Sequence, residues 1–357
     1  MAISRRLFFV GGTASVVSAC FSAGSPAPTP AASATPTPTP TPTPTSTGEV
    51  PGWAQFKRSF LDATGRVVDT GNRGISHSEG QGYGMVMAFF SNDRPAFESL
   101  WNWTRTTLAR PDGLHIWRYD PAAADPVADR NNATDGDVLI AWALGLAGRT
   151  WNVPEWTAQA AHIRQAMLRV NAVTFGNRRV LLPGETGFAM ADKVVLNPAY
   201  YVWPALDAFA RLAPAEGWGD IITGGTQLLT DARFGAHQLP PDWVDVAADG
   251  RLAPASGRDP RFGYDAVRVP LYAHLGGRSG LARPAVEYWA GKIAANQPAP
   301  AWVDVTSGAE AEYAGAEGVQ AIVALTTGRG TGPAALSSDY YSAVLQLLAR
   351  LDPARFT

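Results

Sequence analysis

The sequence predicts a single, mostly α-helical domain that follows a segment unable to build a core. Apolar residues recur at intervals of three and four along most of residues 51–357, as in helices that bury one face. Strand-like patterns are few and short, the clearest being 193–196 and 243–246. No linker-like segment interrupts these 307 residues, and all 12 tryptophans lie among them. We therefore expect one large all-α domain with a few short strands.

Eleven segments carry the helical spacing. The predicted helices span residues 53–63, 79–91, 95–109, 136–150, 155–171, 201–212, 217–231, 265–275, 281–296, 313–326 and 337–351. The loops between them are rich in Gly, Pro, Asp and Asn, which favours a functional site built from loops and helix ends. So many helices in one unit favour stacked or ring-like helical hairpins, although no repeat period marks a solenoid of identical units.

Composition excludes several classes of protein. The 29 Lys and Arg residues nearly balance the 31 Asp and Glu residues, so the net charge of −2 gives no basic footprint for nucleic acid. With 46% hydrophobic and 17% charged residues, the chain can bury a large core. Its single cysteine, Cys20, excludes an intrachain disulfide and a cysteine-based metal cluster.

The first 20 residues resemble an export signal. Arg5 and Arg6 precede an uncharged run of 13 residues, 7–19, which is shorter than the roughly 20 residues that span a bilayer. The paired arginines resemble a twin-arginine signal, and residues 17–20 resemble a lipobox in which Cys20 is lipidated. The alternatives are an ordinary signal peptide cut nearby and a merely buried cysteine.

Residues 21–50 predict a linker. Eight prolines alternate mainly with Thr, Ser and Ala between residues 25 and 48, which favours an extended, semi-rigid chain. We therefore divide the chain into an export signal with lipobox (1–20), a Pro/Thr-rich disordered linker (21–50) and a catalytic domain (51–357). This organisation predicts an exported bacterial protein, periplasmic or at the cell surface, that contacts the membrane only through a lipidated Cys20.

The first of three acidic clusters surrounds Glu79. Glycines at 80, 82 and 84 lie in the first turns of a predicted helix, where each costs about 1 kcal/mol relative to alanine. Close approach of a ligand or of another helix would explain them. Their GxGxG spacing differs from the GxGxxG of dinucleotide sites. The alternative is that Ser78 caps the helix and Glu79 only complements its dipole.

The other two clusters also lie at predicted helix starts. Asp135 and Asp137 open the helix at 136–150, in a segment that lacks the later oxygen ligands of a calcium loop. Asp265 and Arg268 would share one face if residues 265–268 are helical, and a cation there favours an ionised carboxylate. A plain helix cap for Asp135 and a structural ion pair for Asp265 remain as alternatives.

Together these segments resemble glycoside hydrolase family 8. In chain order they are SEGQGYGM at 78–85, ATDGDVLIAWAL at 133–144, NPAY at 197–200 and GYDAVRVPLY at 263–272. The resemblance covers nearly all of residues 51–350. It implies an (α/α)6 barrel of helical hairpins and glycoside hydrolysis with inversion of configuration, without metal or cofactor. The family contains bacterial endoglucanases, some associated with cellulose synthesis, and some chitosanases and xylanases.

The resemblance also implies roles for three acids. Glu79 matches the general acid, Asp265 the general base, and Asp135 a residue that is catalytic or holds the sugar at the cleavage point. Asp137 is expected to be a structural partner. Some family members have Asn at the position of Asp265, so the aspartate here favours the endoglucanase type.

Four further residues match substrate-binding positions. Tyr200 and Tyr264 match tyrosines near the attacking water, Arg268 matches the arginine beside the base, and Trp117 matches a sugar-stacking position. Ala199 replaces a frequent serine, which leaves the catalytic assignment intact.

The chemistry of inversion sets conditions on the two main acids. One carboxyl must protonate the leaving oxygen and the other must activate water, about 6.5 to 9.5 Å away. A helix N-terminus favours an ionised Glu79, against its role as an acid. Enclosure in the cleft, Tyr83 one turn later and repulsion from Asp135 must therefore outweigh the dipole.

We expect an endo-β-1,4-glucanase that acts on cellulose-like β-glucan chains. Chitosan or xylan hydrolysis by the same site and a surface lipoprotein that only binds polysaccharide are the alternatives. Cellulose synthase machinery is a further expected partner if the task is to trim the cell's own polymer. Three histidines, His77, His115 and His274, are too scattered to predict a metal site.

Overall fold

The structure is a computed structural model, and it describes residues 48–330 and 332–356. The predicted export signal, Cys20 and nearly all of the predicted linker therefore lie outside the described residues. The described part forms one compact unit by its internal contacts.

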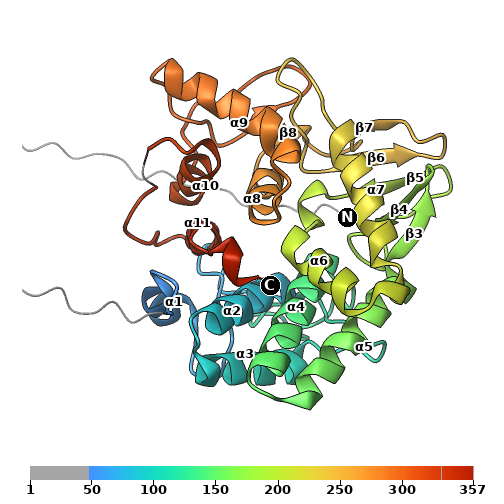
Figure 1. The fold of residues 1–357 in the computed structure, drawn as a ribbon, viewed down its shortest axis with the longest axis vertical. Helices are drawn as coiled ribbons and strands as arrows, with labels where there is room; N and C mark the ends of the chain where they lie inside the picture. Colours follow the sequence, from blue (N-terminus) through green and yellow to red (C-terminus); the bar gives the residue numbers. More distant parts are fainter. Residues whose placement is uncertain (1–47, 331, 357) are drawn as a thin grey trace, which may run out of the picture. The chain divides into compact units, whose positions relative to one another are not determined.

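Eleven α-helices are the main elements of this part of the chain, and each overlaps a predicted segment (Figure 1). They are α1 (Trp53–Phe60), α2 (Ser78–Phe90), α3 (Arg94–Thr107), α4 (Thr134–Thr150), α5 (Pro154–Val170), α6 (Trp203–Leu212), α7 (Trp218–Asp231), α8 (Arg268–Leu275), α9 (Ser279–Ala294), α10 (Glu317–Thr327) and α11 (Tyr340–Leu348). The prediction of a mostly helical domain is confirmed.

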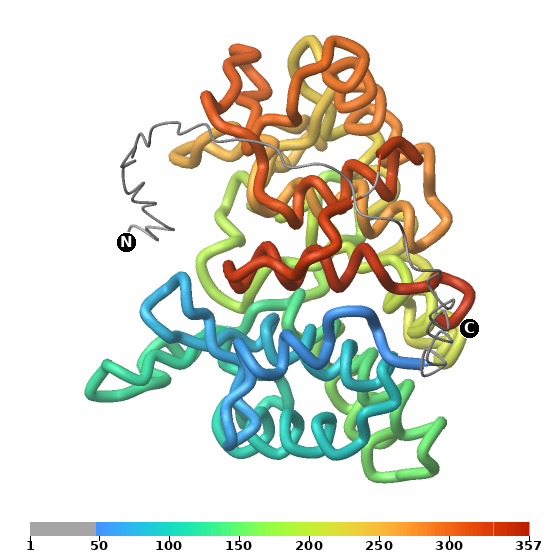
Figure 2. Tube along the Cα trace, turned by 90° about the vertical axis from the view of Figure 1, so that its left-hand side faces the viewer, coloured from blue at the N-terminus to red at the C-terminus, as the bar shows by residue number. Residues whose placement is uncertain are grey.

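Two kinds of helix build the core. Helices α2, α4, α8 and α11 are buried on all faces along nearly their whole length, including most of the polar residues in their first turns. Helices α3, α5 and α7 bury only one face and lie outside them. Contacts run from α2 to α4, from α4 to α6 and from α6 to α8. The C-terminal α11, red in Figure 2, lies between the N-terminal helices and the later ones.

Glycines let the inner helices approach closely. A Cβ atom on Gly82 would lie 2.6 Å from the Cβ of Leu139 in α4. A Cβ on Gly136 in α4 would lie 2.2 Å from the Ser78 hydroxyl and 2.7 Å from the backbone nitrogen of Glu79. The glycines beside the first acidic cluster therefore serve helix-to-helix contact, and they bring the starts of α2 and α4 together.

Nine short strands form four small antiparallel sheets at the edges of the helical core. They are β1 (Ser76–His77) with β2 (Arg118–Tyr119), β3 (Ala172–Phe175) with β4 (Arg178–Leu181), β5 (Lys193–Leu196) with β6 (Val244–Ala247) and β7 (Leu252–Pro254), and β8 (Arg261–Phe262) with β9 (Val303–Asp304). Pairing of Leu196 with Val244 brings the 197–200 segment beside residues 242 and 243. Pairing of Ser76 with Tyr119 brings Trp117 to the start of α2.

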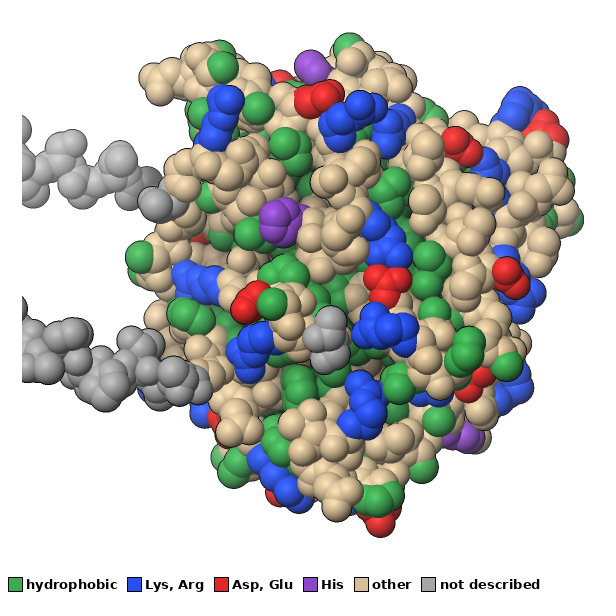
Figure 3. Space-filling model, viewed as in Figure 1, with side chains coloured by type: hydrophobic (Ala, Val, Ile, Leu, Met, Phe, Trp, Pro, Cys, Tyr) green, Lys and Arg blue, Asp and Glu red, His purple; other side chains and the backbone are tan. Residues whose placement is uncertain are grey.

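The surface carries no single-sign field on the face drawn in Figure 3, where acidic and basic side chains are interspersed. Within residues 48–330 and 332–356, no helix combines the length and the apolar character needed to cross a membrane.

Candidate active site

The predicted catalytic side chains meet where three inner helices begin. Glu79 lies in the first turn of α2, Asp135 lies in the first turn of α4, and Arg268 is the first residue of α8. The Ser78 hydroxyl is buried without a hydrogen-bond partner and does not cap α2, whose N-cap residue is His77. The capping alternative for Ser78 is therefore wrong.

Arg268 holds the acids together. Its Nη1 donates to Glu79 Oε1 and lies 3.7 Å from Asp135 Oδ2, while its Nη2 donates to Asp265 Oδ1 at 2.8 Å. The guanidinium is almost fully buried, so these ion pairs are shielded from solvent. Segments 189 residues apart in the sequence thus share one cation.

The structure corrects the expected local geometry of the third cluster. Helix α8 starts at Arg268, so Asp265 lies in the preceding turn and not in the helix. The backbone nitrogen of Arg268 donates to the carbonyl of Asp265 at 3.0 Å, and this turn preserves the side-chain pair. Arg268 also contacts Glu79, which the sequence spacing did not predict.

Glu79 and Asp135 form a carboxyl pair. Burial raises the pKa of Asp135 well above its usual range, and the negative charge of Glu79 and a hydrogen bond between the two carboxyls raise it further. The Glu79 side chain is 23% exposed, whereas that of Asp135 is 4% exposed. The environment therefore favours the protonated form of Asp135, and Glu79 is the member that faces solvent.

Two buried tyrosines complete the surroundings of Glu79. The Tyr83 hydroxyl donates to Glu79 Oε1 at 3.0 Å and accepts from Arg268 Nη1 at 2.8 Å. The Tyr272 hydroxyl lies 3.1 Å from that of Tyr83. Burial raises the pKa of Tyr83 well above its usual range, so it stays a neutral donor.

Asp265 is oriented from two sides. Asn197 Nδ2 donates to its Oδ2 at 3.2 Å, opposite the bond from Arg268 to Oδ1. The Asn197 Oδ1 accepts from the backbone nitrogen of Ala199 at 2.9 Å, which fixes the amide orientation. Asn197 lies in the NPAY segment, but sequence reasoning had given it no role because its partner is 68 residues away.

Asp242 is a second acid that the sequence analysis missed. Its Oδ1 accepts from the backbone nitrogens of Gly263, Asp265 and Ala266, at 3.3, 3.0 and 2.7 Å. Burial, and then the charge of Asp265, raise the pKa of Asp242 to about 7. Only the tertiary fold brings this acid to the third cluster, so no local pattern could have found it.

Aromatic side chains lie around the acids. Trp117 stacks against His77 at 6.1 Å, and its carbonyl accepts from the backbone nitrogen of Ser78 at 3.0 Å, so it lies beside the turn that carries Glu79. Tyr200 is buried and packs edge-on against Trp243. Tyr264 is half-buried and directly precedes Asp265, and its carbonyl accepts from the Tyr341 hydroxyl.

Asp137 is a structural residue, as expected. Its Oδ1 accepts from the backbone nitrogen of His115 at 3.0 Å and contacts His115 Nδ1 at 2.8 Å, and its Oδ2 accepts from Asn132. Among residues 48–330 and 332–356, no group of three or more His, Cys, Asp or Glu side chains is arranged to hold a metal ion.

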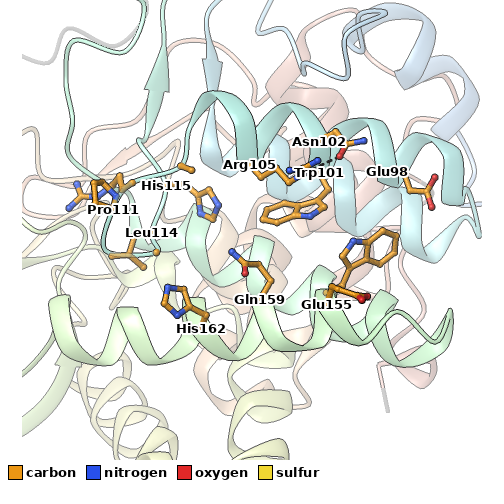
Figure 4. Close-up of a pocket in the computed structure, with 14 residues that line it drawn as sticks. Glu98, Trp101, Asn102, Arg105, Pro111, Leu114, His115, Glu155, Gln159 and His162 are labelled. Carbon is orange, nitrogen blue, oxygen red and sulfur yellow. Dashed lines mark hydrogen bonds between the residues drawn. The ribbon is translucent and has the colours of Figure 1, made fainter.

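A cavity of about 670 Å³ lies away from these acids, between α3 and α5. In Figure 4, Trp101 from α3 and Gln159 and His162 from α5 lie between the two helices. None of the predicted site residues lines it.

Comparison with known proteins decides the family. Residues 41–354 match the family described as glycosyl hydrolases family 8. The chain belongs to glycoside hydrolase family 8. An endoglucanase from Cellulomonas uda is 41% identical over 278 residues, which are 77% of each chain. A probable endoglucanase from Novacetimonas hansenii is 42% identical over 313 residues, covering 85% of this chain and 91% of the relative.

Solved structures of family 8 agree with the fold. An endo-β-1,4-glucanase from an Achatina fulica gut metagenomic library has a TM-score of 0.80 and 42% identity, covering 84% of this chain and 95% of that one. One from Acetobacter xylinum has a TM-score of 0.78 and 41% identity, covering 83% and 95%. The predicted (α/α)6 barrel and the prediction of a glycoside hydrolase are thereby confirmed.

Proposed function

We propose that this family 8 protein is an endo-β-1,4-glucanase that hydrolyses cellulose-like β-glucan chains with inversion of configuration. The observation that carries the proposal is the attachment of two carboxylates, Glu79 and Asp265, to one buried guanidinium. Inversion needs an acid and a base on opposite sides of the cleaved bond, and this cation holds one candidate for each. The endoglucanase names of its relatives support the substrate class.

Glu79 serves as the general acid and Asp135 supports it. An acid near a cation and a helix N-terminus would readily lose its proton, but the carboxyl pair retains one. As the glycosidic bond breaks, that proton passes through Glu79, the more exposed member, to the leaving oxygen. Both carboxyls of the pair are then ionised, and Arg268, which contacts Glu79 and lies 3.7 Å from Asp135 Oδ2, offsets their negative charge until a proton returns from water.

Asp265 serves as the general base that activates water. Hydrogen bonds from Arg268 and Asn197 fix both of its oxygens, so one lone pair of the carboxylate has a defined direction toward the water. Tyr200 and Tyr264 support this side of the site, and Trp117 supplies a flat apolar face for a sugar ring beside Glu79.

Paired acid variants test these assignments. Glu79→Gln and Asp265→Asn should each lower kcat on soluble cellulose by about 100- to 10,000-fold while binding of substrate is retained. Glu287→Gln in α9 and Asp207→Asn in α6 are controls, because these acids form ion pairs elsewhere. Unchanged rates in the active-site variants would support the alternative of a polysaccharide-binding protein without catalysis.

A substrate screen tests the specificity. Parallel assays on soluble cellulose, chitosan and β-xylan should show the highest kcat/KM on cellulose. A higher kcat/KM on chitosan or xylan would mean that the same acid and base act on that polymer, and that the proposed substrate is wrong.

We also propose that the chain is exported by the twin-arginine route and anchored through lipid on Cys20. The paired Arg5 and Arg6 and the lipobox-like residues 17–20 support this proposal. Labelling of cells with a radioactive fatty acid should mark the wild type and not Cys20→Ser. An unlipidated protein that is released from the cells would contradict the anchor.

This location favours cellulose synthase machinery as a partner, with the task of trimming the cell's own polymer. Association with that machinery in a pull-down from native membranes would support this proposal.

A further inference from the structure

We infer that Asp242 is a positioning residue for the proposed base, Asp265. This inference rests on the proposed function, because it assumes that Asp265 activates water. The hydrogen bonds of Asp242 go to the backbone around Asp265. Asp242 acts through the turn that carries Asp265.

The hydrogen bonds show how the turn is held. A single oxygen, Asp242 Oδ1, accepts from three backbone nitrogens within residues 263–266, one of them from Asp265 itself. The backbone nitrogen of Asp242 donates to the carbonyl of Arg261 at 2.7 Å, which ties the two segments together from the other side. The turn is thus wrapped around a carboxylate from a different segment of the chain, two residues before β6.

Placing a carboxylate this close to Asp265 costs free energy, so stabilisation of the turn alone does not explain why an acid is present here. Asp242 is half-buried, and the nearby negative charge of Asp265 opposes its own charge. A neutral acceptor of the same shape would satisfy the three amides without that repulsion. What the turn needs is the acceptor oxygen, because it must present Asp265 toward Arg268 and Asn197, where a displacement of about 1 Å can lower the rate about 100-fold.

Two substitutions separate the positioning role from a general loss of structure. Asp242→Asn keeps an oxygen in the place of Oδ1 and should stay within about fivefold of wild-type kcat. Asp242→Ala leaves three amides without their acceptor, and we expect kcat to fall about 100-fold with KM changed less than threefold. Asp245→Ala is a matched control, since Asp245 on β6 accepts from the backbone of Ser256, away from the acids.

The inference is overturned if Asp242→Ala keeps wild-type kcat, or if the Asn and Ala variants lose the same activity. Thermal unfolding is measured for each variant, to check that it is folded at the assay temperature. If Asp242→Ala does not fold, Asp242→Ser replaces it with the same two outcomes, because its short hydroxyl cannot reach all three amides. An active Asp265→Asn variant would instead overturn the proposed function, and this inference with it.

A separate observation concerns the cavity between α3 and α5. We infer that it binds a second stretch of neutral sugar chain, which rests on the proposed β-glucan substrate. Its volume of about 670 Å³ lies in the usual range of ligand sites. With 1.5 Å of rise per residue, its lining on each helix, residues 98–105 and 155–162, is about 10 Å long, enough for a short oligosaccharide.

The lining fits an uncharged ligand with apolar faces. Two indoles, Trp101 and Trp156, supply flat apolar surface, and Asn102, Gln159 and His162 supply hydrogen-bond donors and acceptors. The four charged side chains that line the cavity sum to no net charge: Glu98 pairs with Arg94 and Arg110 with Asp112, and Arg105 and Glu155 carry opposite signs. Sugar rings combine hydroxyl groups with flat C–H faces, so they match this set better than an ion does.

Calorimetric titration of the Glu79→Gln protein with a soluble β-1,4-gluco-oligosaccharide tests this inference without turnover. We expect two binding sites per chain, and one site when Trp156→Ala or Gln159→Ala is added. Gln165→Ala, also on α5 but directed to Glu216, should keep both sites. One site in the Glu79→Gln protein itself, or two sites in all variants, would overturn the inference, whereas the acid and base assignments depend only on the kcat values above.

Discussion

At the scale of single residues, the site depends on one cation surrounded by three carboxyl groups. Arg268 can neutralise one negative charge, so three ionised acids around it would be costly in a buried place. A proton on the Glu79–Asp135 pair relieves that cost, and in the proposed mechanism it is the proton that the general acid delivers. The electrostatic balance of the resting site is therefore also the starting condition of the reaction.

Arg268→Lys should lower kcat by about 100-fold. A lysine ammonium cannot donate to Glu79, Tyr83 and Asp265 in the fixed planar arrangement of a guanidinium, so the acid and the base lose their common support. Arg278→Lys is the matched control, because Arg278 also grips a carboxylate, Asp207, with two nitrogens. Equal losses of activity in the two variants would contradict the role given to Arg268.

Asp135→Asn should raise the stability of the protein at neutral pH and lower its activity. The pKa of Asp135 is raised in the folded state, so its contribution to stability is full below about pH 3.8 and is lost as pH rises through the folded pKa. Asparagine removes this pH dependence and can still accept from Gly136.

Thermal unfolding between pH 4 and pH 8 checks this expectation. The difference in Tm between Asp135→Asn and the wild type should grow with pH. Asp137→Asn is the contrast, since it breaks bonds to His115 and Asn132 and should lower Tm throughout. A Tm difference for Asp135→Asn that shrinks as pH rises would show that the pKa direction is wrong.

At the scale of secondary-structure elements, the site forms because the starts of α2 and α4 nearly touch. The glycine at 136 has no side chain, and the first turn of α2 occupies the space that a Cβ would need. This contact sets Glu79 beside Asp135, and the start of α8 brings Arg268 to both. The first turns of these helices thus position the acidic and basic side chains, and packing of the apolar parts of the helices fixes where the first turns lie.

Gly136→Ala should lower both stability and kcat. Its Cβ would lie 2.2 Å from the Ser78 hydroxyl and 2.7 Å from the Glu79 nitrogen, so α2 and α4 must separate, at about 1 to 3 kcal/mol. Gly145→Ala in the same helix is the control, because its nearest neighbour would be 3.6 Å away and alanine favours helix. Chemical denaturation and kcat should both separate the two variants, and similar losses in both would refute the close-approach argument.

The helices could be predicted from sequence because each repeats its apolar spacing over several turns. The two-residue strands β1, β2, β8 and β9 could not, since two residues carry no periodicity. The start of α8 was placed three residues early, because its turn around Asp242 depends on an acid from another part of the chain.

At the scale of the whole molecule, inner helices from distant parts of the chain close around one end that holds the acids. The motifs around Glu79, Asp135 and Asp265 could be found in the sequence, and the fold brings all three to Arg268. Asn197 and Asp242 could not be assigned in that way, because their roles exist only through partners that lie more than 20 residues away. The acids can therefore be found from the sequence, whereas Asn197 and Asp242, which orient the proposed base, can be found only from the fold.

Proton NMR of the first product released from a soluble β-1,4-glucan tests most directly whether the acid and the base act in a single displacement. The arrangement of Glu79 and Asp265 on Arg268 predicts that the new reducing end appears in the α configuration and converts to the β form only by later mutarotation. An initial product in the β configuration would require a covalent intermediate on one of these carboxylates, and it would contradict the account.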